Sequence, residues 1–356
     1  MTDTPEPPTP PEPSPPHRRR VRYRGTHPRQ FGERYKEREP TKYPELIAHV
    51  RESGRTPAGQ HIPILVAEVL TVLAPGPGAR GVDATLGYGG HAAELLARLA
   101  PGGRLLALDA DPVELPKTEA RLRALGHDET TLVVRRTNFA GLLAALGEVG
   151  WQDGVDFVFA DLGVSSMQID DPARGFTFKF DGPLDMRMNP RRGLSAAQWL
   201  ERASVETLTE ILTDHADEPH AAVIAKALCA RRGALTTTLG LAETVRQTPA
   251  PRVPADDVEM SVRRVFQALR IEVNDEFGAL DSLLRALPTA LRPGGRAALL
   301  SFHSGEDRRV KKAFQQGLKD GNYARASDEV IRPSPAEQRE NPRSSSAKLR
   351  WAQRSS

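Results

Sequence analysis

The stretch Gly81-Val-Asp-Ala-Thr-Leu-Gly-Tyr-Gly-Gly-His91 decides the fold of this chain. It indicates a short apolar strand, a glycine-rich turn and the start of a helix, an arrangement that lets backbone N–H groups approach a ligand closely. A second apolar segment, Leu105-Leu-Ala-Leu, ends on Asp109, eighteen residues after His91. The pattern predicts a cofactor-binding loop after the first strand of an α/β domain.

Two classes of cofactor fit this loop. Gly87, Gly89 and Ala92 match the dinucleotide pattern G-x-G-x-x-G/A, and Asp109 stands where a ribose-binding acid belongs. Asp83 favours S-adenosylmethionine, because a carboxylate, and not a phosphate cradle, matches the cationic amino-acid end of that molecule. An aspartate that only caps a turn is the alternative for Asp83. The loop by itself leaves both cofactors open.

The order of the predicted elements indicates the architecture. Apolar segments with the composition of strands lie at residues 104–109, 131–136, 155–161 and 296–303. Strands that alternate with helical segments form a parallel, doubly wound sheet, so the sequence predicts an α/β fold. Ligands of such sheets bind beyond the carboxyl ends of the strands. The residues expected to converge there are Gly87 to His91, Asp109, Asn138, Phe139 and Asp161.

Phe139 has two interpretations. Most Phe side chains pack in a core, whereas a ring just past the third strand can also stack on an adenine. Both stay open at this point.

The periodicity changes after Asp161. Residues 170–189 are polar and punctuated by glycine, and residues 195–232 and 238–245 return to helical spacing. Long loops inside compact domains are usually functional. We expect one helix over residues 261–287 to lead back into the sheet domain. Its polar row is interpreted as a solvated face and consists of Arg263, Gln267, Arg270 and Asn274.

These changes predict a domain plan. A disordered tail, first Pro-rich and then basic, covers residues 1–55. The sheet domain covers 56–165 and 261–356, and a helical insert covers 166–260.

Composition narrows the functional classes. The net charge of +3 over 356 residues is too small to indicate nucleic-acid binding by itself. The single cysteine, Cys229, excludes a disulfide framework and a cysteine-based zinc site within one chain. No apolar run approaches the ~20 residues of a membrane span. We therefore expect a cytoplasmic protein with no membrane partner.

Several segments carry a resemblance to a known family. They are Gly87-Tyr-Gly-Gly-His91, Asp161-Leu-Gly-Val-Ser-Ser166, Arg174-Gly-Phe176, Asp181-Gly-Pro-Leu-Asp-Met-Arg-Met188, Phe266-Gln-Ala-Leu-Arg-Ile271, Ser301-Phe-His-Ser304 and Glu340-Asn-Pro-Arg343. In this order they resemble the bacterial 16S rRNA (cytosine-N4)-methyltransferase family, RsmH, formerly called MraW. The resemblance runs from about residue 60 to the C-terminus, and the tail lies outside it.

The resemblance implies a class I S-adenosylmethionine-dependent methyltransferase with an RNA-recognising helical insert. Its substrate would be N4 of a cytidine in the decoding centre of 16S rRNA, within the small ribosomal subunit. The implied cofactor contacts are Gly89, Gly90, His91, Asp109, Phe139, Asp161 and Gln168. No metal is implied. We assign contact with the base amine to Ser165 and Ser166, at the end of the fourth strand. The oligomeric state stays open, a homodimer being one arrangement.

A loop before the insert has the composition of an RNA contact. Basic and aromatic groups, which can hold an unstacked nucleotide, alternate there as Arg174, Phe176, Phe178, Lys179, Phe180 and Arg187. A small hydrophobic lid over the insert junction is the alternative.

The chain departs from the family pattern in two segments. Ala216-Asp-Glu-Pro-His220 stands where the family has Gly-Glu-Glu and an aromatic residue, and Met260-Ser-Val-Arg-Arg-Val265 replaces His-Pro-Ala-Thr-Arg-Thr. We expect both segments to contact RNA and to leave the cofactor site unchanged.

Two rival functions remain. An NAD-linked oxidoreductase fits the glycine loop but lacks an evident acid/base partner for hydride transfer. A non-catalytic ribosome-assembly factor would have no need to keep Gly89, Gly90, Asp109 and Asp161 together.

Overall fold

The computed structural model describes residues 63–248 and 254–356, so the predicted tail at residues 1–55 lies outside the described residues. Within this part of the chain, one seven-stranded sheet has the order β3-β2-β1-β4-β5-β7-β6. Its strands are β1 (Arg80–Asp83), β2 (Arg104–Asp109), β3 (Leu132–Arg136), β4 (Val155–Asp161), β5 (Leu291–Ser301), β6 (Tyr323–Ala326) and β7 (Lys348–Arg354).

The strand directions define the fold. Strands β1 to β5 are parallel, and β7 runs antiparallel to both β5 and β6. The strand order reverses between β1 and β4, which is the switch point where ligands of doubly wound sheets bind. The predicted parallel, doubly wound sheet is confirmed.

Helices cover both faces of the sheet. On one face lie α3 (Val66–Leu73), α4 (Gly90–Leu99) and α5 (Leu115–Ala124), and on the other lie α6 (Leu142–Glu148), α13 (Glu276–Ala290) and α14 (Ser304–Lys319). Successive side chains of a strand point to opposite faces. Accordingly, Phe157 and Phe159 of β4 pack with the first group, whereas Val158 and Ala160 pack with the second. The sheet is therefore buried on both sides.

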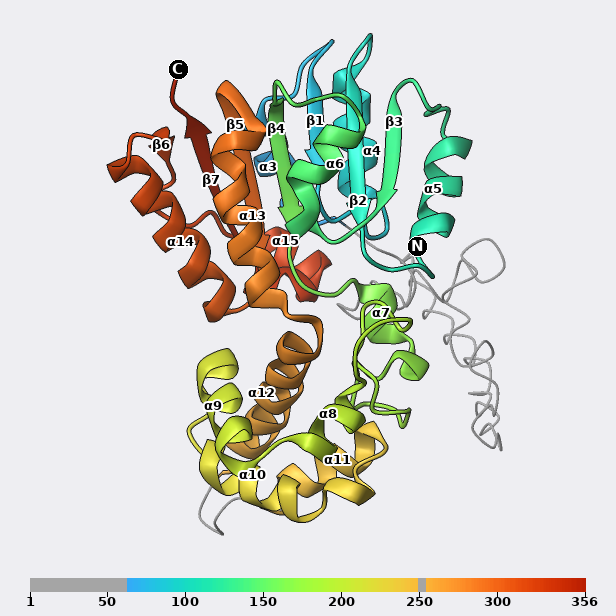
Figure 1. Ribbon diagram of the computed structural model, residues 1–356, viewed down its shortest axis with the longest axis vertical. Helices are drawn as coiled ribbons and strands as arrows, with labels where there is room; N and C mark the ends of the chain where they lie inside the picture. The colour runs from blue at the N-terminus through green and yellow to red at the C-terminus, as the bar shows by residue number, and fades with distance from the viewer. Residues whose placement is uncertain (1–62, 249–253) are drawn as a thin grey trace, which may run out of the picture.

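A helical unit follows β4 along the chain. It contains α8 (Ala196–Arg202), α9 (Val205–Ala216), α10 (Ala221–Ala230), α11 (Thr238–Arg246) and α12 (Ala255–Asn274). Ser195 caps α8 through a reciprocal pair of hydrogen bonds with Gln198, as its sequence predicts. The unit has its own apolar core, and Figure 1 shows the carboxyl ends of the parallel strands pointing toward it.

The expectation of one helix over residues 261–287 is wrong. Helix α12 ends at Asn274, Asp275 takes a left-handed conformation with φ 47°, and α13 begins at Glu276. The break has a physical reason, because Val265 packs in the helical unit while Leu283 packs against the sheet. Since α12 belongs to the core of the helical unit, that unit extends past the expected boundary at residue 260 to the junction at Asp275.

Shorter elements complete the described chain. They are α7 (Ser166–Asp170), η3 (Pro172–Arg174), α15 (Pro335–Glu340) and η5 (Pro342–Ser346), together with η2 (Phe139–Gly141) after β3 and η4 (Arg232–Ala234) in the helical unit. No helix in residues 63–248 and 254–356 combines the length and the apolar character that crossing a membrane requires.

Candidate active site

A cavity of about 470 Å³ lies beyond the carboxyl ends of the parallel strands. Residues from α12 of the helical unit also line it, so both units form its wall. All the predicted site residues line this cavity, namely Gly89, Gly90, His91, Asp109, Phe139, Asp161, Ser165, Ser166 and Gln168. Phe139 also packs against the core on the α6 face of the sheet, and its stacking on an adenine stays a prediction.

The glycine turn is held in shape by Asp109. Gly87 N–H donates to Asp109 Oδ2 at 2.8 Å, and Asp111 N–H donates to Asp109 Oδ1 at 2.8 Å. Gly89 has φ 81°, and a Cβ there would lie 2.9 Å from Thr118 Cγ2. A side chain at this position is therefore excluded both by the backbone conformation and by the neighbouring helix. The turn leaves its backbone open to the cavity.

Two further strand-end acids are buried in the same wall. Asp83 is 1% exposed and accepts a hydrogen bond from Thr85 N–H at 3.1 Å. Burial raises the pKa of Asp83 to about 7, against the effect of the Thr85 hydrogen bond. Burial, and then the nearby charges of Asp83 and Glu306, raise the pKa of Asp161 to about 8. Near neutral pH both acids are therefore substantially protonated.

His91 is oriented toward Asp161. Its Nε2 lies 2.9 Å from the carbonyl oxygen of Ile64. Because a carbonyl can only accept, Nε2 carries the hydrogen, and Nδ1 is the nitrogen that points toward Asp161. The distance from Nδ1 to Asp161 Oδ2 is 3.7 Å, which is too long for a hydrogen bond.

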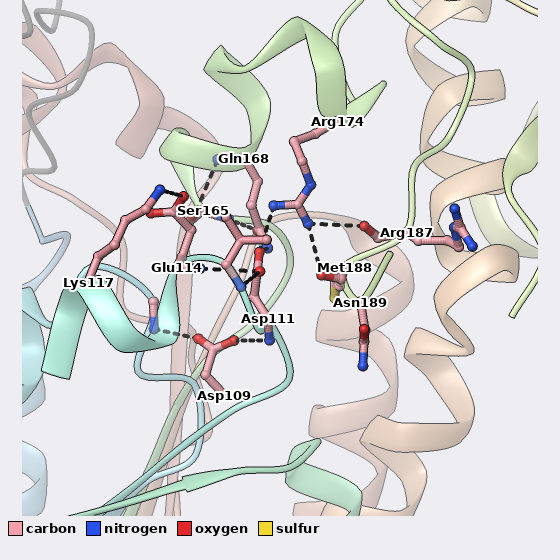
Figure 2. A network of polar contacts seen from close by, with 12 residues as sticks. Asp109, Asp111, Glu114, Lys117, Ser165, Gln168, Arg174, Arg187, Met188 and Asn189 are labelled. Carbon is pink, nitrogen blue, oxygen red and sulfur yellow. Dashed lines mark hydrogen bonds and ion pairs between the residues drawn. The ribbon is translucent and has the colours of Figure 1, made fainter. Parts of the chain in front are cut away.

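Asp111 anchors a polar network that Figure 2 shows from close by. Its buried carboxylate accepts hydrogen bonds from Gln168 Nε2 and Arg174 Nη1, both at 2.8 Å. Arg174 also donates to the carbonyl oxygens of Arg187 and Met188. The network joins the loop after β2 to the segment that leads into the helical unit.

Gln168 and Ser165 are tied to each other within this network. Gln168 Oε1 accepts from Ser165 N–H at 2.9 Å, and Ser165 Oγ accepts from Gln168 N–H at 3.3 Å. This capping box starts helix α7. Both residues line the cavity, but their side chains also support its wall, which sequence reasoning did not anticipate.

The basic and aromatic loop is mostly internal. Arg174 pairs with Asp111, and Arg187 pairs with Asp185 at 2.6 Å. The aromatic residues Phe176 and Phe178 pack against the core of the helical unit. For these four residues the nucleotide-binding role stays a prediction, and the packing of Phe176 and Phe178 fits the alternative of a hydrophobic lid over the insert junction.

A second group of polar residues lines the cavity on the side of the helical unit. It consists of Arg270, Asn274, Glu276 and Glu306, and we call it the acceptor end. Arg270 Nε and Nη2 donate to the two carboxylate oxygens of Glu276 at 2.7 and 2.9 Å. The sequence analysis did not predict this group as part of the site. Arg270 and Asn274 were noted at helical spacing, but they were interpreted as a solvated face, since a polar row on a helix usually faces solvent.

The two segments that depart from the family pattern touch each other. Glu218 is 3% exposed, and its Oε1 accepts a hydrogen bond from Ser261 Oγ at 2.9 Å. Arg264 lies 3.9 Å from the other carboxylate oxygen. The expectation that both segments serve RNA contact is wrong for Glu218 and Ser261, which form a buried link between α12 and the turn before α10.

The part of the cavity wall around the glycine turn, which we call the cofactor end, fits S-adenosylmethionine. It contains the glycine turn and the acids Asp83, Asp109 and Asp161. The arginines among the described residues of the cavity wall are Arg270 and Arg343, which pair with Glu276 and Asp170 respectively. Buried acids without a paired cation gain a counter-charge from a cationic ligand, and a wall without an unpaired arginine offers no cation to bind a pyrophosphate. This electrostatic pattern selects S-adenosylmethionine over NAD.

The strand order and the acidic cofactor end together define the class of protein. It is an S-adenosylmethionine-dependent methyltransferase of class I. A sequence profile of the MraW methylase family matches residues 58–355. The chain belongs to the MraW methylase family, and the oxidoreductase alternative is excluded.

Individual relatives agree with this assignment. Ribosomal RNA small subunit methyltransferase H 1 of Lachnoclostridium phytofermentans is 48% identical over 344 residues, which cover 95% of this chain and 93% of that protein. Ribosomal RNA small subunit methyltransferase H of Burkholderia vietnamiensis is 43% identical over 315 residues, covering 83% and 97%. A SAM-dependent O-methyltransferase structure from Thermotoga maritima overlaps with a TM-score of 0.38 at 12% identity, over 87% of this chain and 71% of that one, too little to support a functional conclusion.

Proposed function

We propose that this enzyme methylates N4 of a cytidine in the decoding centre of 16S rRNA, within the small ribosomal subunit. The observation that carries the proposal is one cavity whose wall comes from both the strand ends and the helical unit, in a chain 48% identical to a protein named ribosomal RNA small subunit methyltransferase H 1. S-adenosylmethionine, when bound, supplies an electrophilic methyl group. The acceptor end is polar enough to receive the edge of a base.

Nucleoside analysis tests the proposal directly. Small-subunit RNA from cells that lack the gene should lose one N4-methylated cytidine, and a plasmid copy should restore it. Unchanged nucleosides in the deleted strain would refute the proposed function.

The cofactor residues divide into two groups by their chemistry. The first group would contact the cofactor through backbone N–H groups at the N-terminus of α4, as glycine turns do, and consists of Gly89, Gly90 and His91. Asp109 would bind ribose hydroxyls, and Asp161 the cationic amino-acid end. Phe139 and Gln168 would complete the adenine side, where Phe139 offers a ring for stacking.

Ser165 and Ser166 remain our proposal for contact with the base amine. Both line the cavity at the start of α7. Because the Ser165 hydroxyl oxygen already accepts from Gln168 N–H, its substitution would also weaken the helix cap. Ser166→Ala is therefore the cleaner variant, and it should raise the KM for RNA while cofactor affinity stays unchanged.

We propose that the substrate is a small-subunit particle and not free RNA. The net charge of +3 is small for an enzyme that would have to hold a folded RNA by electrostatics alone. Methylation should be faster on 30S particles from the deletion strain than on naked 16S RNA. Equal rates on both substrates would contradict this proposal.

A further inference from the structure

Glu306 and His303 form a buried polar pair beside the acceptor end. Glu306 is the third residue of α14, and its Oε2 accepts a hydrogen bond from Phe302 N–H at 2.9 Å. Its Oε1 lies 3.3 Å from His303 Nε2. The side chains of Glu306 and His303 are only 4% and 10% exposed. Glu306 lines the cavity, whereas His303 is not among the residues of the cavity wall.

His303 is unusual because neither of its ring nitrogens makes a hydrogen bond within the described structure, although both are buried. Buried polar atoms in native proteins nearly always have partners, and exceptions often mark functional sites. His303 therefore acts on Glu306 through its charge, from a distance of 3.3 Å between His303 Nε2 and Glu306 Oε1.

Glu276, His303 and Glu306 could also be read as metal ligands, because their ligand atoms lie within 4.8 Å of one another. However, Arg270 already donates to both oxygens of Glu276. A divalent cation would have to approach this buried guanidinium, and like charges in a desolvated site repel strongly. The charge balance therefore favours a proton acceptor over a metal site.

We propose that Glu306 accepts the proton that the target amine releases on methylation. This step rests on the proposed function. In the reaction, the lone pair of N4 forms the new N–C bond while the S–C bond breaks and leaves its electron pair on sulfur. The nitrogen then carries one proton too many and a positive charge. Transfer of that proton to the carboxylate of Glu306 returns an electron pair to nitrogen and neutralises both groups.

The electrostatics of Glu306 suit this role. Burial alone would raise its pKa, but the adjacent His303, the charge of Arg270 and the hydrogen bond from Phe302 N–H together hold the pKa of Glu306 below its ordinary value. The carboxylate is therefore ionised at neutral pH and ready to accept. The N-terminus of α14 adds to this stabilisation, since helix N-termini favour negative charge.

The same contacts suggest a purely structural role, in which Glu306 only caps α14. Glu306→Gln separates the two, because the amide oxygen can still accept from Phe302 N–H but cannot take up a proton. We expect this variant to keep its melting temperature and its cofactor affinity in calorimetry, while the single-turnover rate falls by at least about 100-fold, the scale of lost general-base catalysis. Glu68→Gln makes the same change in the first turn of α3, outside the cavity, and should stay within about twofold of the wild type.

Chemical rescue gives a readout that a helix cap would not show. In Glu306→Ala, added formate should restore part of the single-turnover rate, whereas chloride at equal ionic strength should not. A Glu306→Gln rate close to that of the wild type would overturn the inference. So would loss of wild-type activity in a chelator and its recovery with Mn²⁺, which would make the cluster a metal site.

Failure of the inference and failure of the proposed function are distinguishable. Wild type and variants are assayed together on 30S particles from the deletion strain. An active wild type with an equally active Glu306→Gln rejects only the proton acceptor. An inactive wild type that still binds the cofactor rejects the proposed substrate, and the inference with it.

Discussion

The two ends of the cavity differ in whether their acidic side chains have positively charged partners. At the cofactor end, burial raises the pKa of Asp83, Asp109 and Asp161, and none of these three acids has an arginine or lysine partner in the described structure. At the acceptor end, Glu276 is held by Arg270, and the pKa of Glu306 is lowered. The cofactor end thus lacks positive charge that a cationic ligand can supply, whereas the acids of the acceptor end already have positively charged neighbours.

The largest expected effect comes from removing the charge partner of Asp111, a further acid that lines the cavity beside Asp109. Arg174→Ala removes the guanidinium that pairs with Asp111 at 2.8 Å, where the side chains are 11% and 1% exposed. Removing one partner of a buried ion pair costs about 3 to 5 kcal/mol. We expect the lower limit, since Gln168 and backbone N–H groups still contact Asp111. Urea unfolding measures this loss.

A matched control is available for that prediction. Arg308 pairs with Asp217 at 3.1 Å, but both side chains are more than half exposed. Arg308→Ala should therefore change stability by less than about 1 kcal/mol. Similar losses in the two variants would mean that burial of the Asp111 pair has no energetic consequence.

The next effect concerns cofactor affinity. Asp109→Ala should weaken S-adenosylmethionine binding by roughly 1.5 to 3 kcal/mol, the scale of a lost charge-supported hydrogen bond. Asp153→Ala is the control, because Asp153 precedes β4 and is exposed, away from the cavity. Unchanged affinity of the Asp109 variant in calorimetry would remove this residue from the cofactor site.

The raised pKa values at the cofactor end also predict that cofactor affinity depends on pH. Asp83 and Asp161 have pKa values of about 7 and 8, so at pH 7 they hold protons that a bound cation would displace. Cofactor binding should therefore release on the order of one proton, and affinity should rise as pH increases through this range. Calorimetry in two buffers of different ionisation enthalpy counts the proton. Proton uptake on binding would contradict the assignment of these acids to the cationic end.

The same acids should make the folded protein without cofactor less stable as pH rises, whereas they make cofactor binding tighter. Their folded-state pKa values lie above the ordinary value of 3.8, so the folded protein binds more protons than the unfolded chain between about pH 4 and 8. Stability without cofactor should thus fall as pH rises through this window. Added cofactor should reduce the fall.

The smallest expected effect on catalysis is at Cys229. Methylation at C5 of cytosine ordinarily needs a cysteine nucleophile, whereas the N4 amine can attack directly. Cys229 is buried in α10, with its Sγ 3.8 Å from the carbonyl oxygen of Ala203, and it does not line the cavity. Cys229→Ala should lose about 1 kcal/mol of stability and keep its activity. A folded, cofactor-binding variant without methyl transfer would revive C5 chemistry.

Local sequence by itself determined the cofactor end. The strand, the glycine turn and the acids at the strand ends are each short patterns, and a parallel sheet brings all its carboxyl ends to one edge. These patterns are therefore sufficient to predict that Asp109, Phe139 and Asp161 lie together beside the glycine turn. Their meeting in one cavity follows from the topology that the alternation of strands and helices predicts.

Only the tertiary structure decided the acceptor end. Arg270 and Glu306 come from two separate helices, α12 and α14, and their spacing within each helix does not distinguish a cavity wall from a solvated face. The inward role of Arg174 was hidden for the same reason, since its partner Asp111 is 63 residues away. Side chains that meet through the packing of separate elements are positioned by the whole fold, and short sequence patterns do not encode such contacts.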